Sequence, residues 1–200
     1  MLSRSSRDSR VRSWRHPLWT EYTEFLEEGC DAALFVGMHS RAGTPDGVMN
    51  HTIPGRDFQN LWFNGTLVGE TGINAALCGT WGCPVLLVTG DEASCREGTE
   101  LLGESLTTVS VKRGFSSFSA RNLVPARARE LIEAGARQAL SDLSAVPPYD
   151  PGSPSEIKVE YKNTNAAHTL RFRAGVELLD ARTIVSRAET WWAAWKQFYF

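Results

Sequence analysis

The chain has no long hydrophobic run. None of its apolar stretches approaches the roughly 18 consecutive residues of a membrane-spanning helix, and its first residues lack the apolar segment of a secretory signal. Cysteine is also scarce, with 4 residues in 200 and none in a CxxC pair, so we expect neither a disulfide framework nor a cysteine-based zinc site. These absences predict a cytoplasmic protein without a membrane partner, in which Cys78 and Cys83 are buried, reduced thiols.

The chain lacks a strong net charge as well. Its 21 basic and 23 acidic residues leave a formal charge of -2, which offers no general attraction to nucleic acid, so we expect no nucleic-acid partner. Only residues 1–17 are locally basic, and they contain almost nothing that could be buried in a core. We therefore expect a disordered leader there, rich in serine and in Arg4, Arg7, Arg10, Arg12 and Arg15.

Apolar runs and helical patterns alternate through the middle of the chain. The patterns predict a buried strand over 32–36, an apolar strand over 84–89 and a strand over 107–112. They also predict helices over 72–77, 92–102 and from Pro125 to about residue 140. Strands that alternate with helices form βαβ units, which build a mostly parallel sheet flanked by helices. Residues 18–145 are therefore expected to form an α/β core.

Patterns of strands and turns flank or interrupt this alternation of strands and helices. Asn64-Gly65, a dipeptide favoured in tight type I′ turns, separates two short strand patterns at 58–63 and 66–68, so we expect a β-hairpin. A proline-rich stretch at 146–154 reads as a linker. Beyond it, strands at 157–161 and 183–186 and a final aromatic-rich helix predict a smaller C-terminal α+β part over 155–200. Trp191, Trp192 and Trp195 on that helix are expected to be core or subunit contacts.

Three polar side chains follow predicted strands and could carry chemistry. His39 follows the strand at 32–36 and Glu70 follows the hairpin, so an imidazole and a carboxylate suited to zinc could meet at one end of a sheet. His51, in a polar loop, could move protons or stabilise an oxyanion. Each residue could also have an ordinary structural role. His39 could be a hydrogen-bonded structural residue, and His51 could be an exposed loop residue. Glu70 could be a charge at a helix start that the helix dipole favours. Asp91 and Glu92 form an acidic pair at another strand end, but as candidates for a helix cap they need no catalytic explanation.

The order of three motifs resembles the D-aminopeptidase family of dipeptide-transport operons. The motifs are ALFVGMH at 33–39, GTPDGVMNH at 43–51 and VGETGINA at 68–75. Further agreement comes from PVLLVTGD at 84–91 and LVPARA at 123–128, so the resemblance extends from about residue 25 to the C-terminus.

This resemblance implies a cytoplasmic, homo-oligomeric metallohydrolase that releases N-terminal D-amino acids from short peptides with two zinc ions. It implies His39 and Glu70 as metal ligands and His51 as a catalytic residue. It also implies an Asp-x-Glu-Gly motif and another ligand histidine upstream of Ala32, and an arginine where Ser117 stands. The chain contains no Asp-x-Glu-Gly, so we expect an N-terminally truncated member with an exposed sheet edge.

Two functions remain open from the sequence. The first is a zinc-dependent D-aminopeptidase, and the second is a catalytically inactive homologue that binds peptides or forms oligomers. Stoichiometric zinc and release of a D-amino acid would distinguish the first from the second. In either case we expect self-association, because an exposed edge and the tryptophan-rich helix would favour contact between copies.

Overall fold

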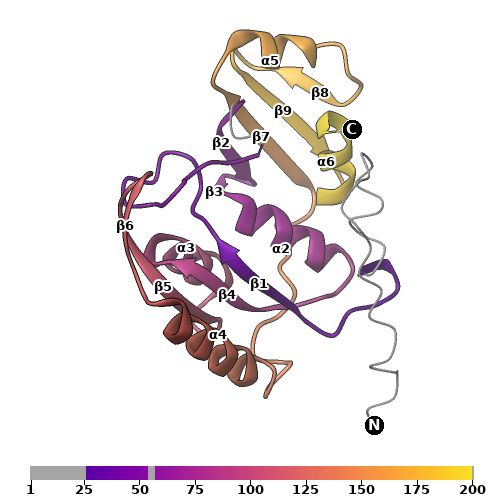
Figure 1. The fold of residues 1–200 in the computed structure, drawn as a ribbon. Coiled ribbons are helices and arrows are strands. Elements are labelled where there is room, and N and C mark those ends of the chain that lie inside the picture. The colour runs from indigo at the N-terminus through magenta and orange to yellow at the C-terminus, as the bar shows by residue number, and fades with distance from the viewer. Residues whose placement is uncertain (1–25, 54–56, 200) are drawn as a thin grey trace.

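The computed structural model describes residues 26–53 and 57–199, arranged around two β-sheets (Figure 1). The predicted leader at 1–17 lies outside the described residues. Helix α2 (Glu70–Thr80) lies between the sheets. Its Ala75 and Cys78 pack in the core of the first sheet, whereas Ile73 and Leu77 pack in the core of the second. One helix therefore joins the two cores, and its first residue, Glu70, is held between them.

The first sheet confirms the predicted α/β architecture. Its strands run in the order β1 (Ala33–Met38), β4 (Val85–Asp91), β5 (Thr107–Ser116) and β6 (Ser119–Asn122). The first three are parallel, and β6 returns antiparallel to β5 as a strand that the sequence analysis did not predict. The parallel strands end at one edge of the sheet, which is the usual position for a site in α/β proteins.

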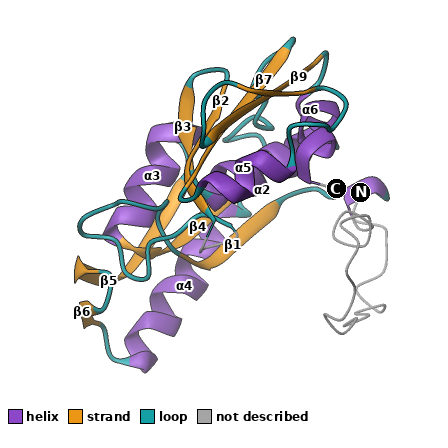
Figure 2. Cartoon of the chain, turned by 90° about the horizontal axis from the view of Figure 1, so that it is seen from above, coloured by secondary structure: helices purple, strands orange, loops and turns teal. Residues whose placement is uncertain are grey.

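Helices α3 (Glu92–Leu102) and α4 (Pro125–Ala139) cover opposite faces of this sheet (Figure 2). Gly98 of α3 faces the Val88 side chain, whereas Gly135 of α4 faces Leu87. Adjacent residues of a strand point to opposite faces, so the two helices must lie on different sides. The bounds of α3 are those expected from the sequence, and α4 begins at Pro125 as predicted.

The second sheet is antiparallel and takes strands from both sides of the proline-rich linker. Its order is β3 (Thr66–Val68), β2 (Phe58–Phe63), β7 (Ser155–Tyr161), β9 (Thr183–Ala188) and β8 (Val176–Leu178). The predicted hairpin is confirmed, with positive φ at Asn64 and Gly65. Strand β2 of the hairpin pairs on its other side with β7, the central strand of the sheet, where Leu61 lies opposite Val159. The division into parts at 18–145 and 155–200 stays a prediction, while the hydrogen bonding joins the hairpin to the C-terminal strands.

The C-terminal helix α6 (Trp191–Tyr199) closes the core of the second sheet, and a short helix, α5 (Thr164–Thr169), lies beside β7. Trp195 is fully buried and Trp191 is 4% exposed. Their rings are stacked, with centroids 5.3 Å apart. The core interpretation of these tryptophans is confirmed, and the idea that Trp191 and Trp195 form a surface for self-association is wrong, because the apolar face of α6 packs on β7 and β9.

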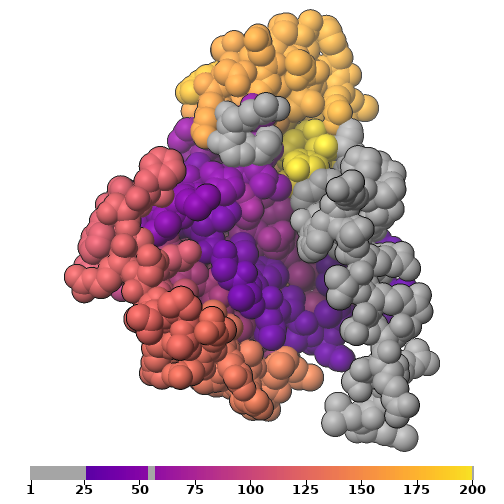
Figure 3. Space-filling view, in the orientation of Figure 1, coloured from indigo at the N-terminus to yellow at the C-terminus, as the bar shows by residue number. Residues whose placement is uncertain are grey.

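Strand β1 is not the buried strand that its apolar sequence predicted. Among the described residues it pairs on one side only, with β4, and Val36 is 60% exposed. Atoms of the segment containing β1 form much of the visible face in the space-filling view (Figure 3). The expected exposed sheet edge is therefore present in the described part of the chain. In contrast, Val85, Leu86 and Val88 of the central strand β4 are buried.

The cysteines and the helix lengths were also predicted from the sequence. Cys78 and Cys83 are buried in the core of the first sheet, and all four cysteines are free thiols. Within residues 26–53 and 57–199, no helix combines the length and the apolar character needed to cross a membrane.

Candidate metal centre

His39 and Glu70 are brought together where β1 ends and α2 begins. His39 directly follows the last residue of β1, and Glu70 is the first residue of α2. Gly69 directly precedes Glu70, and a Cβ atom at Gly69 would lie 2.5 Å from Glu97 Oε1 and 2.7 Å from Arg41 Cβ. Because only glycine fits so close to Arg41, Gly69 allows the start of α2 to approach the residues that follow His39.

His51 arrives from a loop over residues 40–52 that is tied down by many hydrogen bonds. The Ala42 N–H donates to Thr52 Oγ1 at 3.1 Å, and the Gly43 N–H donates to Asn50 Oδ1 at 3.0 Å. Asn50 Nδ2 donates to the Ser117 hydroxyl oxygen at 2.7 Å, linking the loop to the β5–β6 turn. The long loop is therefore an ordered structure that holds His51 in one place.

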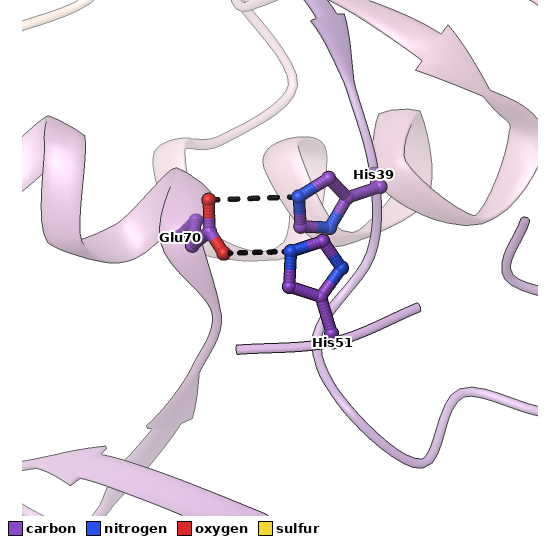
Figure 4. A group of neighbouring side chains, drawn as sticks. All are labelled: His39, His51 and Glu70. Carbon is purple, nitrogen blue, oxygen red and sulfur yellow. Dashed lines mark ion pairs between the residues drawn. The ribbon is translucent and has the colours of Figure 1, made fainter. Parts of the chain in front are cut away.

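The three predicted residues converge (Figure 4). His39 Nε2 lies 3.5 Å from Glu70 Oε2, and His51 Nε2 lies 3.4 Å from Glu70 Oε1. The two imidazole rings are stacked, with centroids 3.9 Å apart and an angle of 20° between their planes. One donor atom from each residue lies within 4.8 Å of the others, so a single cation could contact all three.

Both imidazoles are oriented by backbone carbonyls. His39 Nδ1 lies 3.2 Å from the Ser40 oxygen, and His51 Nδ1 lies 2.7 Å from the Met49 oxygen. A carbonyl oxygen can only accept, so in each of these contacts the imidazole Nδ1–H donates, and Nε2 is the ring atom that faces Glu70. A carbonyl behind the imidazole is the usual outer-shell partner of a metal-binding histidine.

The electrostatics of the cluster also favour a cation. Glu70 is largely buried, and its Oε1 atom is shielded from solvent without a hydrogen bond. The hydrogen bond to Glu70 raises the pKa of His39, and partial burial opposes that effect. Two imidazole nitrogens and a carboxylate are the nitrogen and oxygen donors that zinc accepts, and three protein donors are typical of a catalytic zinc site. The residues present therefore fit a zinc ion.

Comparison with known proteins shows the family of the chain. The family model described as D-aminopeptidase matches residues 15–200. The chain belongs to the D-aminopeptidase family. It is 33% identical over 162 residues to the D-aminopeptidase of Bacillus subtilis (strain 168), an alignment that covers 81% of this chain and 58% of that protein.

A solved structure confirms the fold of the family. The chain is similar to the Zn-dependent D-aminopeptidase DppA from Bacillus subtilis, described as a self-compartmentalizing protease, with a TM-score of 0.81 and 30% sequence identity. The match covers 88% of this chain and 64% of that one. The chain thus spans about three fifths of the length of both relatives.

The remaining residues singled out by the sequence have structural contacts. Asp91 caps α3 as expected, since its Oδ1 accepts the Ser94 N–H at 2.7 Å. Ser117, where the family resemblance implied an arginine, is in the turn after β5 and contacts Asn50. Two contacts to the loop over residues 40–52 were not predicted from the sequence. Glu97 accepts the Arg41 N–H at 2.8 Å, and Asp91 accepts a second N–H, from Val48.

Proposed function

We propose that this chain is a zinc-dependent D-aminopeptidase that releases N-terminal D-amino acids from short peptides. The observation that carries the proposal is the convergence of His39, His51 and Glu70 on one point at the carboxyl edge of the parallel strands. Membership of the D-aminopeptidase family and likeness to the zinc-dependent relative support the same chemistry.

The proposed roles follow from the atoms that face the centre. His39 Nε2 and the Glu70 carboxylate would hold zinc, and the resemblance implies a second ion in the same centre. Zinc bound there would supply Lewis acidity toward the peptide carbonyl and activation of water. His51 is proposed as the catalytic residue. Since its Nδ1–H is held by the Met49 carbonyl, its Nε2, which faces Glu70, would be the atom that accepts a proton or contributes a third ligand.

The proposal extends to the setting of the protein. The relative with a solved structure is described as self-compartmentalizing, which supports a homo-oligomer for this chain too. The cytoplasmic location is part of the same proposal.

The first experiment measures zinc content by elemental analysis after dialysis against trace zinc, with hydrolysis of a D-alanyl peptide assayed in parallel. Wild type is compared with His39→Ala, and His168→Ala is the matched control, because His168 is exposed on α5, far along the chain from the centre. The expected result is near-stoichiometric zinc and turnover in wild type and in the control, with both lost in His39→Ala.

The other outcomes are equally informative. Wild type with neither zinc nor hydrolysis would reject the enzyme and support an inactive homologue that binds peptides or forms oligomers. Zinc that is retained in His39→Ala would place the metal away from the proposed centre.

A further inference from the structure

Asp91 holds two segments of the chain at once. It is completely buried at the carboxyl end of β4. Its Oδ1 accepts the Ser94 N–H at 2.7 Å, which caps α3, and its Oδ2 accepts the Val48 N–H at 2.6 Å. Both distances are short for hydrogen bonds between N–H and oxygen, so both contacts are expected to be firm. An N-cap needs only the first of them.

The sheet brings the end of β4, where Asp91 lies, close to the end of β1, since Gly90 pairs with Met38. A Cβ atom at Gly90 would lie 2.3 Å from the Met38 carbonyl oxygen, so glycine is required for β4 to run this close to the end of β1. Asp91 is therefore placed by the sheet next to the segment that carries His39.

The contact to Val48 is linked to His51 through the residue between them, Met49. The next residue, Met49, has a φ of 52°, a left-handed conformation that a methionine rarely adopts. Two external bonds hold this part of the loop, one from Val48 N–H to Asp91 and one from Met49 N–H to the Ser117 carbonyl at 2.8 Å. The strained conformation points the Met49 carbonyl at His51 Nδ1, which is 2.7 Å away.

We propose that Asp91 is a positioning residue for His51. Through Val48, its buried carboxylate holds Met49 in the conformation whose carbonyl fixes the His51 proton on Nδ1 and leaves Nε2 facing Glu70. The inference rests on the proposed function, in which Nε2 of His51 takes part in the reaction or binds the metal. It assigns Asp91 a second role beyond capping α3.

Two substitutions separate that role from capping. Serine and asparagine are both good N-caps, so Asp91→Ser and Asp91→Asn are expected to keep α3 and to remain folded. Serine is too short to reach Val48, and the asparagine amide would turn a donor toward the Val48 N–H. Asp46→Asn is the matched control, because Asp46 lies in the same loop but pairs at the surface with Arg96.

The first readout is the His51 tautomer in the metal-free protein, measured by long-range proton–nitrogen correlation spectra. The His51 signals are assigned by comparison with His51→Ala. Wild type and Asp46→Asn are expected to show His51 protonated on Nδ1, and both Asp91 variants are expected to show a mixture of tautomers. The second readout is zinc affinity by calorimetry, expected to fall roughly 10- to 100-fold in the Asp91 variants, the usual effect of losing an outer-shell contact.

Each result decides one question. A wild-type tautomer and wild-type zinc affinity in both Asp91 variants would overturn the positioning role. Variants that unfold at much lower denaturant than wild type, with an unchanged tautomer in the folded protein, would reduce Asp91 to a structural residue. If wild type itself binds no zinc, the proposed function fails, and the tautomer measurement still tests the effect of Asp91 on His51.

Discussion

Glu97 is a buried carboxyl group whose charged form is disfavoured by its surroundings. Its side chain, on the inner face of α3, is only 6% exposed. Burial raises its pKa, and the Arg41 N–H at 2.8 Å and the Arg41 guanidinium at 3.6 Å compensate in part. A carboxylate with a raised pKa releases its proton more readily in the unfolded chain, so its ionisation lowers the stability of the folded protein.

Glu97→Gln is therefore expected to change the pH dependence of stability. Wild type should lose stability as the pH rises from about 4.3, the ordinary glutamate pKa, through the higher folded value, whereas the variant should not. Urea unfolding at pH 4 and pH 8 should show the variant gaining on wild type as the pH rises. Glu100→Gln, exposed on the same helix, controls for the loss of one charge. An equal difference at both pH values would contradict the prediction.

Gly114 of β5 shows how closely the loop over residues 40–52 packs on the first sheet. A Cβ atom there would lie 2.1 Å from the Asp46 carbonyl oxygen and 3.0 Å from Val48 Cγ2. Gly114→Ala must push the loop outward, and overpacking of this kind costs about 1–3 kcal/mol. We expect that loss in urea unfolding, together with weaker zinc binding. Ser116→Ala, exposed on the same strand, should change neither, and tolerance of alanine at Gly114 would mean that the loop moves freely.

At the scale of elements, α6 depends on its tryptophans. Trp195 is fully buried between α6 and the second sheet, with its ring 6.3 Å from that of Phe63. Trp195→Ala is expected to lower the free energy of unfolding by about 3–5 kcal/mol, the usual cost of removing a large buried side chain. The control is Phe172→Ala, because Phe172 is 83% exposed and should cost less than about 1 kcal/mol. Similar losses in both variants would mean that α6 is not part of the core.

The elements that the sequence predicted best have strong local signals. Helix α3 begins at its Asp91 cap, and the hairpin turns at Asn64-Gly65, where positive φ is required. Strand β6, helix α5 and strand β8 were missed because they are short, with no apolar period long enough to detect. Exposure of β1 was also missed, since an apolar run predicts burial without saying what covers it.

At the scale of the whole molecule, the sheet edge at β1 supports self-association. Strand edges readily pair with other chains, and β1 has β4 on one side among the described residues. We expect sedimentation velocity at micromolar concentration to show species larger than the 22.1 kDa chain. A single species of monomer mass across that range would contradict the prediction. Trp191 and Trp195 do not contribute to this contact, because they are in the core.

The sequence by itself determined the α/β class, the hairpin, the family resemblance and the identity of His39, His51 and Glu70 as candidates. These properties depend on local sequence patterns and on the order of the motifs. Only the tertiary structure decided that the three side chains meet, because contact between residues far apart in the chain depends on how strands and loops pack. The second contact of Asp91 and the burial of Glu97 were decided in the same way, since a carboxylate beside a helix start looks identical in sequence whether it faces solvent or a loop.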